Sequence, residues 1–190
     1  MNKLLAAALI AAAATLSACG GNEAAQAERA ARKANPAPCP NIVALNEAAR
    51  IIEFDGDETA ENIAYTGEIV NVSASCRYFT DKPIDAEVSI DLAFGRGPKG
   101  AAGEKVFNYF VAVTRKDAEV IAKTEFAVPI KFSGDNPVET TRVEINKILI
   151  PRANAAVSGT NFEIIVGFAV TPKQAIYNRS GKSLKFPNIK

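Results

Sequence analysis

The sequence predicts an all-β fold, an antiparallel two-layer sandwich of immunoglobulin-like architecture with about seven strands. From Cys39 onward, apolar and polar residues alternate with the period of two that marks a β-strand. Turn-forming residues separate the alternating runs, and no later run carries an apolar face at helical spacing. A small closed barrel is the alternative arrangement. The chain has no Trp, so the buried Trp of antibody domains is absent and the likeness is one of architecture.

The alternating runs predict the strands in chain order. Residues 42–54 supply the first strand, with a break near residues 46–49. A bulge is expected in the run that begins at Val143, because Ile145 and Ile148 are three residues apart. The other predicted inward faces are Val70, Val72, Ala74, Cys76 and Tyr78; Val88, Ile90, Leu92 and Phe94; Phe107, Tyr109, Val111 and Val113; Val120, Ala122, Thr124, Phe126, Val128, Ile130 and Phe132; and Phe162, Ile164, Val166, Phe168 and Val170.

Composition excludes several classes of function. The chain has 190 residues, no His, and a formal net charge of +1 from 22 basic and 21 acidic side chains. Without His there is no Ser-His-Asp triad and no imidazole metal ligand. A nearly neutral mixed surface argues against nucleic acid as a partner, because phosphate neutralisation needs a basic stripe. The length suits one domain.

Residues 1–18 have the pattern of a secretory signal peptide. Lys3 is the one charged residue, and the uncharged run Leu4–Leu16 follows it. This run is too short for a membrane-spanning helix, which needs about 20 apolar residues, and it has the length of a signal-peptide core. We therefore expect export from the cytoplasm.

The end of this segment, Leu16-Ser17-Ala18-Cys19, resembles the lipobox of bacterial lipoproteins. The resemblance implies cleavage before Cys19 and acylation of its thiol and amino group, so the lipid bilayer becomes a partner. Gly20 favours the outer membrane over the inner membrane. With its Cys39-Pro40 opening, the body resembles uncharacterised proteobacterial envelope lipoproteins. An ordinary signal peptide before a chance cysteine is the alternative.

Residues 19–38 are predicted to be a tether between the lipidated cysteine and the domain at 39–190. The segment is rich in Ala and contains no large apolar residue that could join a core. Pro36 and Pro38 would end any transient helix there. We expect a flexible, periplasm-facing spacer, with a docking helix as the alternative.

The two other cysteines, Cys39 and Cys76, are predicted to form a disulfide that fastens the first strand to the second. Export places them in an oxidising compartment. A free buried pair and a redox site are the alternatives, although redox cysteines usually have the spacing C-x-x-C.

The segment Gly95-Arg96-Gly97-Pro98-Lys99-Gly100 matches the pattern G-x-G-x-x-G. A dinucleotide site needs a helix directly after these glycines, and a strand-like run follows instead. We therefore expect no nucleotide, and interpret residues 95–103 as a mobile hairpin loop. Its exposed Arg96 and Lys99 are candidate contacts for a protein partner.

An acidic segment follows the first strand. Asp55, Asp57, Glu58 and Glu61 are the candidate ligands for calcium, which binds several oxygen atoms, and Glu53 precedes them. The segment does not fit the EF-hand pattern, so a solvated acidic turn is the alternative. A third interpretation is that two of these carboxylates form the catalytic pair of a glycoside hydrolase, which would require a cleft between them. No catalytic residue and no cofactor are predicted.

The C-terminal segment is basic, because no acidic residue follows Glu163. Lys182 and Lys185 are candidate contacts for an acidic partner or for lipid headgroups. The interspersed Tyr177, Leu184, Phe186 and Ile189 suit an edge strand, a partner groove or packing against the domain. A solvated tail is the alternative.

The sequence thus predicts a non-enzymatic lipoprotein of the cell envelope that binds another envelope protein. A small-ligand or calcium-binding module of the periplasm is the alternative, with residues 53–61 as its site. A hydrolase that uses carboxylates is the third hypothesis.

Overall fold

The computed structural model describes residue 26 and residues 38–116, 119–134 and 136–185. The chain divides into two compact units, Met1–Pro36 and Ala37–Lys190. The predicted signal peptide, the lipidation site Cys19 and nearly all of the tether lie outside the described residues. Within the described part, no helix is long and apolar enough to span a membrane.

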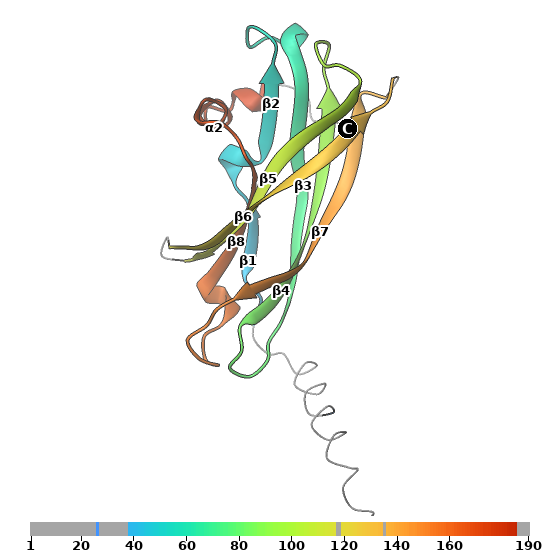
Figure 1. The fold of residues 1–190 in the computed structure, drawn as a ribbon. Helices are drawn as coiled ribbons and strands as arrows, with labels where there is room; N and C mark the ends of the chain where they lie inside the picture. The colour runs from blue at the N-terminus through green and yellow to red at the C-terminus, as the bar shows by residue number, and fades with distance from the viewer. Residues whose placement is uncertain (1–25, 27–37, 117–118, 135, 186–190) are drawn as a thin grey trace, which may run out of the picture. The chain divides into compact units, whose positions relative to one another are not determined.

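The second unit contains two four-stranded sheets packed face to face (Figure 1). The sheets remain separate, so the predicted all-β sandwich is confirmed and the closed alternative is not formed. One sheet has the strand order β1 (Asn41–Ala44), β8 (Phe162–Phe168), β5 (Gly103–Arg115) and β6 (Val120–Phe132). The other has the order β2 (Arg50–Phe54), β3 (Ile63–Arg77), β4 (Ile84–Arg96) and β7 (Val138–Ile150).

The first predicted strand is two strands, which accounts for the eight strands among the described residues where about seven were expected. The predicted break is confirmed: the 3₁₀ turn η1 (Asn46–Ala48) separates β1 from β2, and these strands join different sheets. β1 pairs in parallel with β8, whereas the other strand pairs are antiparallel. This parallel edge pair is an exception within the predicted antiparallel sandwich.

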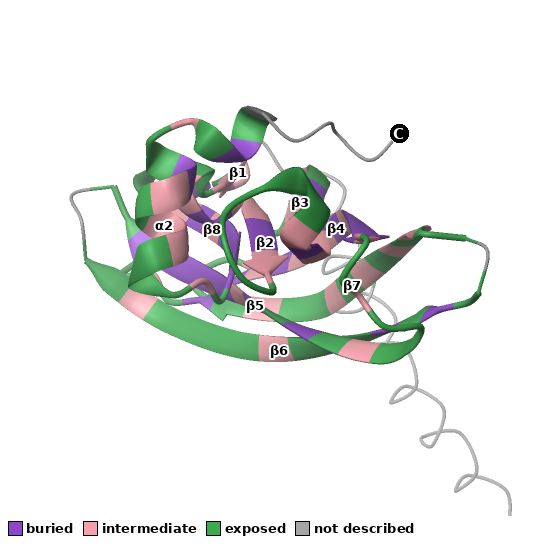
Figure 2. Ribbon diagram, turned by 90° about the horizontal axis from the view of Figure 1, so that it is seen from above, coloured by how far each residue is buried: buried purple, intermediate pink, exposed green. Residues whose placement is uncertain are grey.

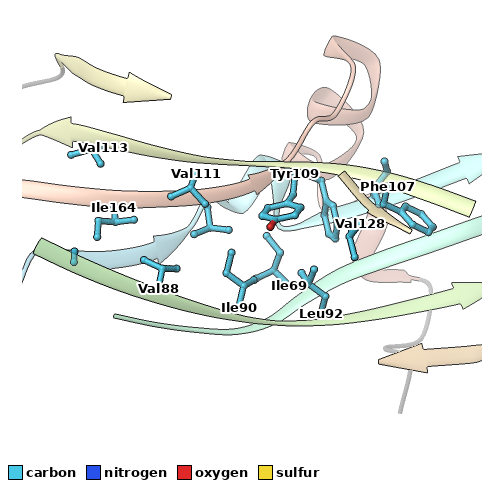
Figure 3. Packing of buried hydrophobic residues seen from close by; sticks show 14 of the residues in the cluster. Ile69, Val88, Ile90, Leu92, Phe107, Tyr109, Val111, Val113, Val128 and Ile164 are labelled. Atoms are coloured by element: carbon cyan, nitrogen blue, oxygen red, sulfur yellow. The ribbon is translucent and has the colours of Figure 1, made fainter. Parts of the chain in front are cut away.

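The core is built from the inner faces of both sheets (Figure 3). Ile90 and Leu92 of β4 face Tyr109 and Val111 of β5, and all four side chains are buried. Phe94 is part of an aromatic cluster in this core. Its ring centroid lies 4.4 Å from that of Phe107 and 5.9 Å from that of Phe168. The alternating pattern of β4, β5 and β8 therefore predicted the core correctly.

A bulge in β3 reverses which side of the strand faces inward. The register with β4 shifts between Ile69 and Asn71, so Val70 is the extra residue and is 62% exposed. Beyond it, Val72, Ala74 and Cys76 turn inward and pack against the core. The predicted inward position of Val70 is therefore wrong, because the bulge lies between two stretches of opposite phase.

The expected bulge in β7 is confirmed. Ala86 of β4 pairs with Ile148, and Val88 pairs with Ile145, so the β7 strand carries one extra residue between the two pairs. Both isoleucines pack against the core in spite of their spacing of three.

β6 follows the predicted alternation from Phe126 onward, but its first half is largely exposed and its register with β5 shifts at Ile121. Val128, Ile130 and Phe132 are in the core, whereas Val120, Ala122 and Thr124 are exposed. Figure 2 shows this exposed edge strand in green. The prediction that all seven alternating residues face the core is wrong for the first half, because burial needs an opposing layer that alternation does not provide.

The disulfide between Cys39 and Cys76 is present, with a Cα–Cα distance of 5.6 Å. It joins the segment just before β1 to β3, and so connects the two sheets. The Tyr78 hydroxyl strengthens this corner, because it donates to the Pro38 carbonyl at 2.7 Å and accepts from the Gly159 N–H at 2.6 Å. The domain is therefore fastened where the chain enters it.

Candidate functional site

The segment 95–103 passes from one sheet to the other. β4 ends at Arg96 and β5 begins at Gly103, and these strands belong to different sheets, so the predicted hairpin is wrong. The segment is docked on β3: the Gly97 N–H donates to the Ala64 carbonyl at 2.8 Å, and the Lys99 N–H donates to the Ile63 carbonyl at 3.0 Å. These backbone bonds explain the glycine pattern without a nucleotide.

The glycines permit this close approach. A Cβ at Gly97 would lie 2.2 Å from the Ile63 carbonyl oxygen, and a Cβ at Gly100 would lie 2.2 Å from the Ala64 oxygen. We predict that Gly97→Ala lowers the free energy of unfolding by about 1–3 kcal/mol, because the backbone must shift. Urea denaturation measures the change. Gly134→Ala is the matched control, because its added Cβ would meet nothing within 4 Å; equal effects of the two substitutions would contradict the prediction.

The two basic residues of this segment differ in accessibility. Lys99 is exposed, as expected. Arg96 is half-buried, and its guanidinium donates to the Gly134 carbonyl at 2.7 Å, so the expectation of an exposed Arg96 is wrong. The Arg96 side chain is therefore held by a contact within the domain. The exposed side chain of Lys99 remains a candidate contact for a partner.

The acidic segment follows β2. Asp55, Asp57, Glu58 and Glu61 are all exposed, and the described residues contain no group of three acidic, His or Cys side chains placed to hold a metal ion. The backbone N–H of Glu61 and the Thr59 side chain, as hydrogen-bond partners, lower the pKa of the Glu61 carboxyl. Calcium binding stays a prediction without a preformed ligand cluster.

Two of the carboxylates near this segment are already paired with cations. Glu53 accepts from the Lys105 ammonium at 2.6 Å. Glu58 lies between two ammonium groups, 3.5 Å from Lys173 and 3.6 Å from Lys182. The C-terminal basic segment therefore neutralises part of the acidic one.

A surface groove of about 380 Å³ lies between β2, the acidic segment and the helix α2 (Pro172–Arg179). Figure 1 shows α2 beside β2. The groove combines charged and aromatic side chains on both walls. Its lining consists of Ile52, Glu53, Phe54, Gly56, Glu58, Thr171, Lys173, Gln174, Tyr177 and Asn178.

α2 forms because its first turn is capped from both directions. The Thr171 hydroxyl accepts from the Gln174 N–H at 3.3 Å, and the Gln174 side-chain oxygen accepts from the Thr171 N–H at 2.8 Å. Pro172 occupies the first helical position, where its missing N–H is harmless. The expectation of a solvated tail or edge strand is wrong here, and the sequence Thr-Pro-Lys-Gln was the signal for the helix.

Side-chain amides of α2 bind the backbone of β2. The Gln174 amide donates to the Ile52 carbonyl at 3.3 Å, and the Asn178 amide donates to the Arg50 carbonyl at 2.7 Å. Four residues of helix rise about 6.0 Å and two residues of strand rise about 6.7 Å, so the two spacings match. The helix thus supplies donors along the strand edge where a neighbouring strand would supply its N–H groups.

Aromatic and ionic contacts complete the attachment of α2. The Tyr177 ring meets the Phe54 ring edge-on at 5.8 Å, and the Arg179 guanidinium donates to the Glu47 carboxylate at 2.8 Å. Burial, and secondarily the negative charge of Glu58, raise the pKa of the Tyr177 phenol. Lys182 lies 5.6 Å from the Tyr177 ring, whereas the side chain of Lys185 is outside the described part.

Asn178 is the central residue of this attachment. It is buried, and besides the Arg50 carbonyl its amide donates to the Glu47 carbonyl at 2.9 Å. We predict that Asn178→Ala lowers the free energy of unfolding by about 1–3 kcal/mol, because two carbonyls lose their donor. Thermal or urea denaturation checks this. Ile176→Ala, on the 66% exposed side chain of the same helix, should have little effect.

Sequence reasoning selected Glu58 and Lys182 but missed Gln174, Asn178 and Glu47, whose roles depend on pairing across more than a hundred residues. The structure brings the acidic segment and the C-terminal basic segment together around one groove. Comparison of the chain with protein-family models, curated proteins and solved structures gave no match.

Proposed function

We propose that this chain is a membrane-anchored lipoprotein of the cell envelope whose β-sandwich is a non-enzymatic binding module for another envelope protein. The observation that carries the proposal is the division of the cysteines. The chain has three, and Cys39 and Cys76 are joined to each other. Cys19 is left, at the last position of the lipobox-like sequence, where acylation requires a free thiol.

The disulfide also supports export, because such bonds persist in oxidising compartments outside the cytoplasm. Two or more acyl chains on Cys19 would hold the chain stably in a membrane. Lys99, in the segment 95–103 between the two sheets, is an exposed cation that suits contact with an acidic surface, whereas Lys182 beside the groove already lies 3.6 Å from Glu58. The groove between β2 and α2 supplies the concave part of the contact surface.

In-cell cross-linking of the native chain, followed by affinity capture and mass spectrometry, tests the proposal. We expect one envelope protein in near-stoichiometric amount, and a chain that fractionates with membranes. Cys19→Ser is the matched control, because it removes the acylation site and leaves the domain unchanged; it should move the chain to the soluble fraction. Capture of no protein above background, or membrane fractionation independent of Cys19, would overturn the proposal.

A further inference from the structure

We propose that the outer edge of β2 is the acceptor site for an extended, basic segment of the partner protein, and that α2 is a displaceable cover of this edge. The inference rests on the proposed function, because it names how the partner is bound. Addition of a strand to a sheet edge is a common way to recognise extended polypeptides.

The first step is the position of β2. It is the last strand of its sheet and pairs with β3 on one side. On the other side, the carbonyls of Arg50 and Ile52 accept from the side chains of α2. These are the acceptors that an added strand would use, so α2 occupies the place of a missing strand.

The second step is the polar character of the cover. Within α2, Asn178 is the buried residue, and the large apolar side chain of Ile176 is 66% exposed. Helices that belong to a core bury an apolar stripe, and displacing them exposes it to water. Displacing α2 would separate the half-buried Tyr177 ring from Phe54, but its other contacts with β2 are hydrogen bonds and ion pairs, which a new strand can replace.

The third step is charge. The cations of the C-terminal segment pair with carboxylates at both ends of β2: Arg179 with Glu47 of η1, and Lys173 and Lys182 with Glu58 of the acidic segment. When α2 leaves, Glu47 and Glu58 lose these cations beside the exposed Asp55 and Asp57. An incoming strand that carries Lys or Arg restores the pairing, whereas an acidic strand is repelled. The occupant is therefore basic.

The test uses the full chain, purified in detergent, and three fluorescent peptides of about nine residues. The first alternates Lys with Val, the second alternates Glu with Val, and the third is the Lys peptide with Pro at its centre. Fluorescence anisotropy measures binding. We expect the Lys peptide to bind, the Glu peptide not to bind, and the Pro peptide to bind about tenfold more weakly, because Pro cannot donate to the strand edge.

Variants of the cover give the second readout. The double substitution Gln174→Ala and Asn178→Ala removes the amides that bind β2, and should tighten binding of the Lys peptide about tenfold by raising the open fraction. Ile176→Ala should leave binding unchanged. If circular dichroism shows that the double variant is unfolded, the single Gln174→Ala variant, which loses one bond, replaces it. Asp55→Asn with Asp57→Asn should weaken binding of the Lys peptide.

Hydrogen exchange locates the peptide. Bound Lys peptide should protect the amides of β2 and expose those of α2. Equal binding of the Pro peptide, unchanged exchange in α2, or no binding by the folded variants would overturn the inference. Peptide binding without a captured envelope protein counts against the proposed function alone, whereas a captured protein without displacement of α2 counts against this inference alone.

Discussion

Replacing Cys39 and Cys76 together by Ala should lower the free energy of unfolding by about 4 kcal/mol. The disulfide closes a loop with a sequence separation of 37, which contains β1, η1, β2 and most of β3. Without the disulfide, the unfolded chain gains conformational entropy and the folded domain gains very little, so the free energy of unfolding falls. The folded side is weakened too, because β1 is then attached mainly by its four-residue pairing with β8.

Urea denaturation with and without reductant measures this effect. Reduction of the native chain should reproduce the stability of the double variant, and reductant should not change the double variant further. The Tyr78 hydroxyl still bonds the Pro38 carbonyl and the Gly159 N–H, so the variant should fold with a frayed β1 corner. A loss below about 1 kcal/mol would contradict the prediction, because the bridge would then constrain little beyond these hydrogen bonds.

Local pattern was sufficient to predict the alternating strands, the inner faces of β4, β5 and β8, and the bulge of β7, but it missed the bulge of β3 and the exposed first half of β6. It was not sufficient for pairing. Alternation in residues 42–54 cannot show that β1 pairs in parallel with β8, because the partner is more than a hundred residues away. For the same reason, turn residues after β4 predicted a hairpin where the chain crosses to the other sheet. Only contacts between layers decide these features.

The candidate site, too, could be predicted from the sequence only in part. The charged residues at its rim are visible in the sequence as an acidic run and a basic tail. Their meeting depends on α2, whose apolar content is too low for a periodicity signal, although its capping sequence Thr-Pro-Lys-Gln was present. Asn178 appears in the sequence as an ordinary polar residue, and becomes structural only because Glu47 and Arg50 present their carbonyls to it.

The four outer strands of the sandwich are protected in different ways. β1 has four residues, β6 carries Pro129, and β7 contains a bulge, three features that discourage pairing with another chain. β2 is also short, with five residues and a register shift against β3 at Glu53/Phe54, and it is covered in addition by the amides of α2. A cover made of side-chain hydrogen bonds is the one protection among these that a competing strand can reverse, which is why the acceptor site is assigned to β2.

Phe94→Ala should lower the free energy of unfolding by about 3–5 kcal/mol, because it empties a fully buried position between the sheets. The ring contacts Phe107 and Phe168 from the opposite sheet, so its loss removes packing on both sides of the sandwich. Urea denaturation gives the value. Val70→Ala is the control, because the 62% exposed bulge residue should change stability by less than about 0.5 kcal/mol.

Gly67 lies beside the Phe94 ring, and substitution of both residues tests how tightly this part of the core is packed. A Cβ at Gly67 would lie 3.1 Å from both Phe94 and Phe168, so Gly67→Ala alone should overpack the core and cost about 1–3 kcal/mol. In the Phe94→Ala background the same methyl group enters vacated space, and its cost should fall. The two effects are therefore expected to be non-additive. Strict additivity in the double variant would mean that Gly67 is required by its backbone or by Ile51, and not by the aromatic cluster.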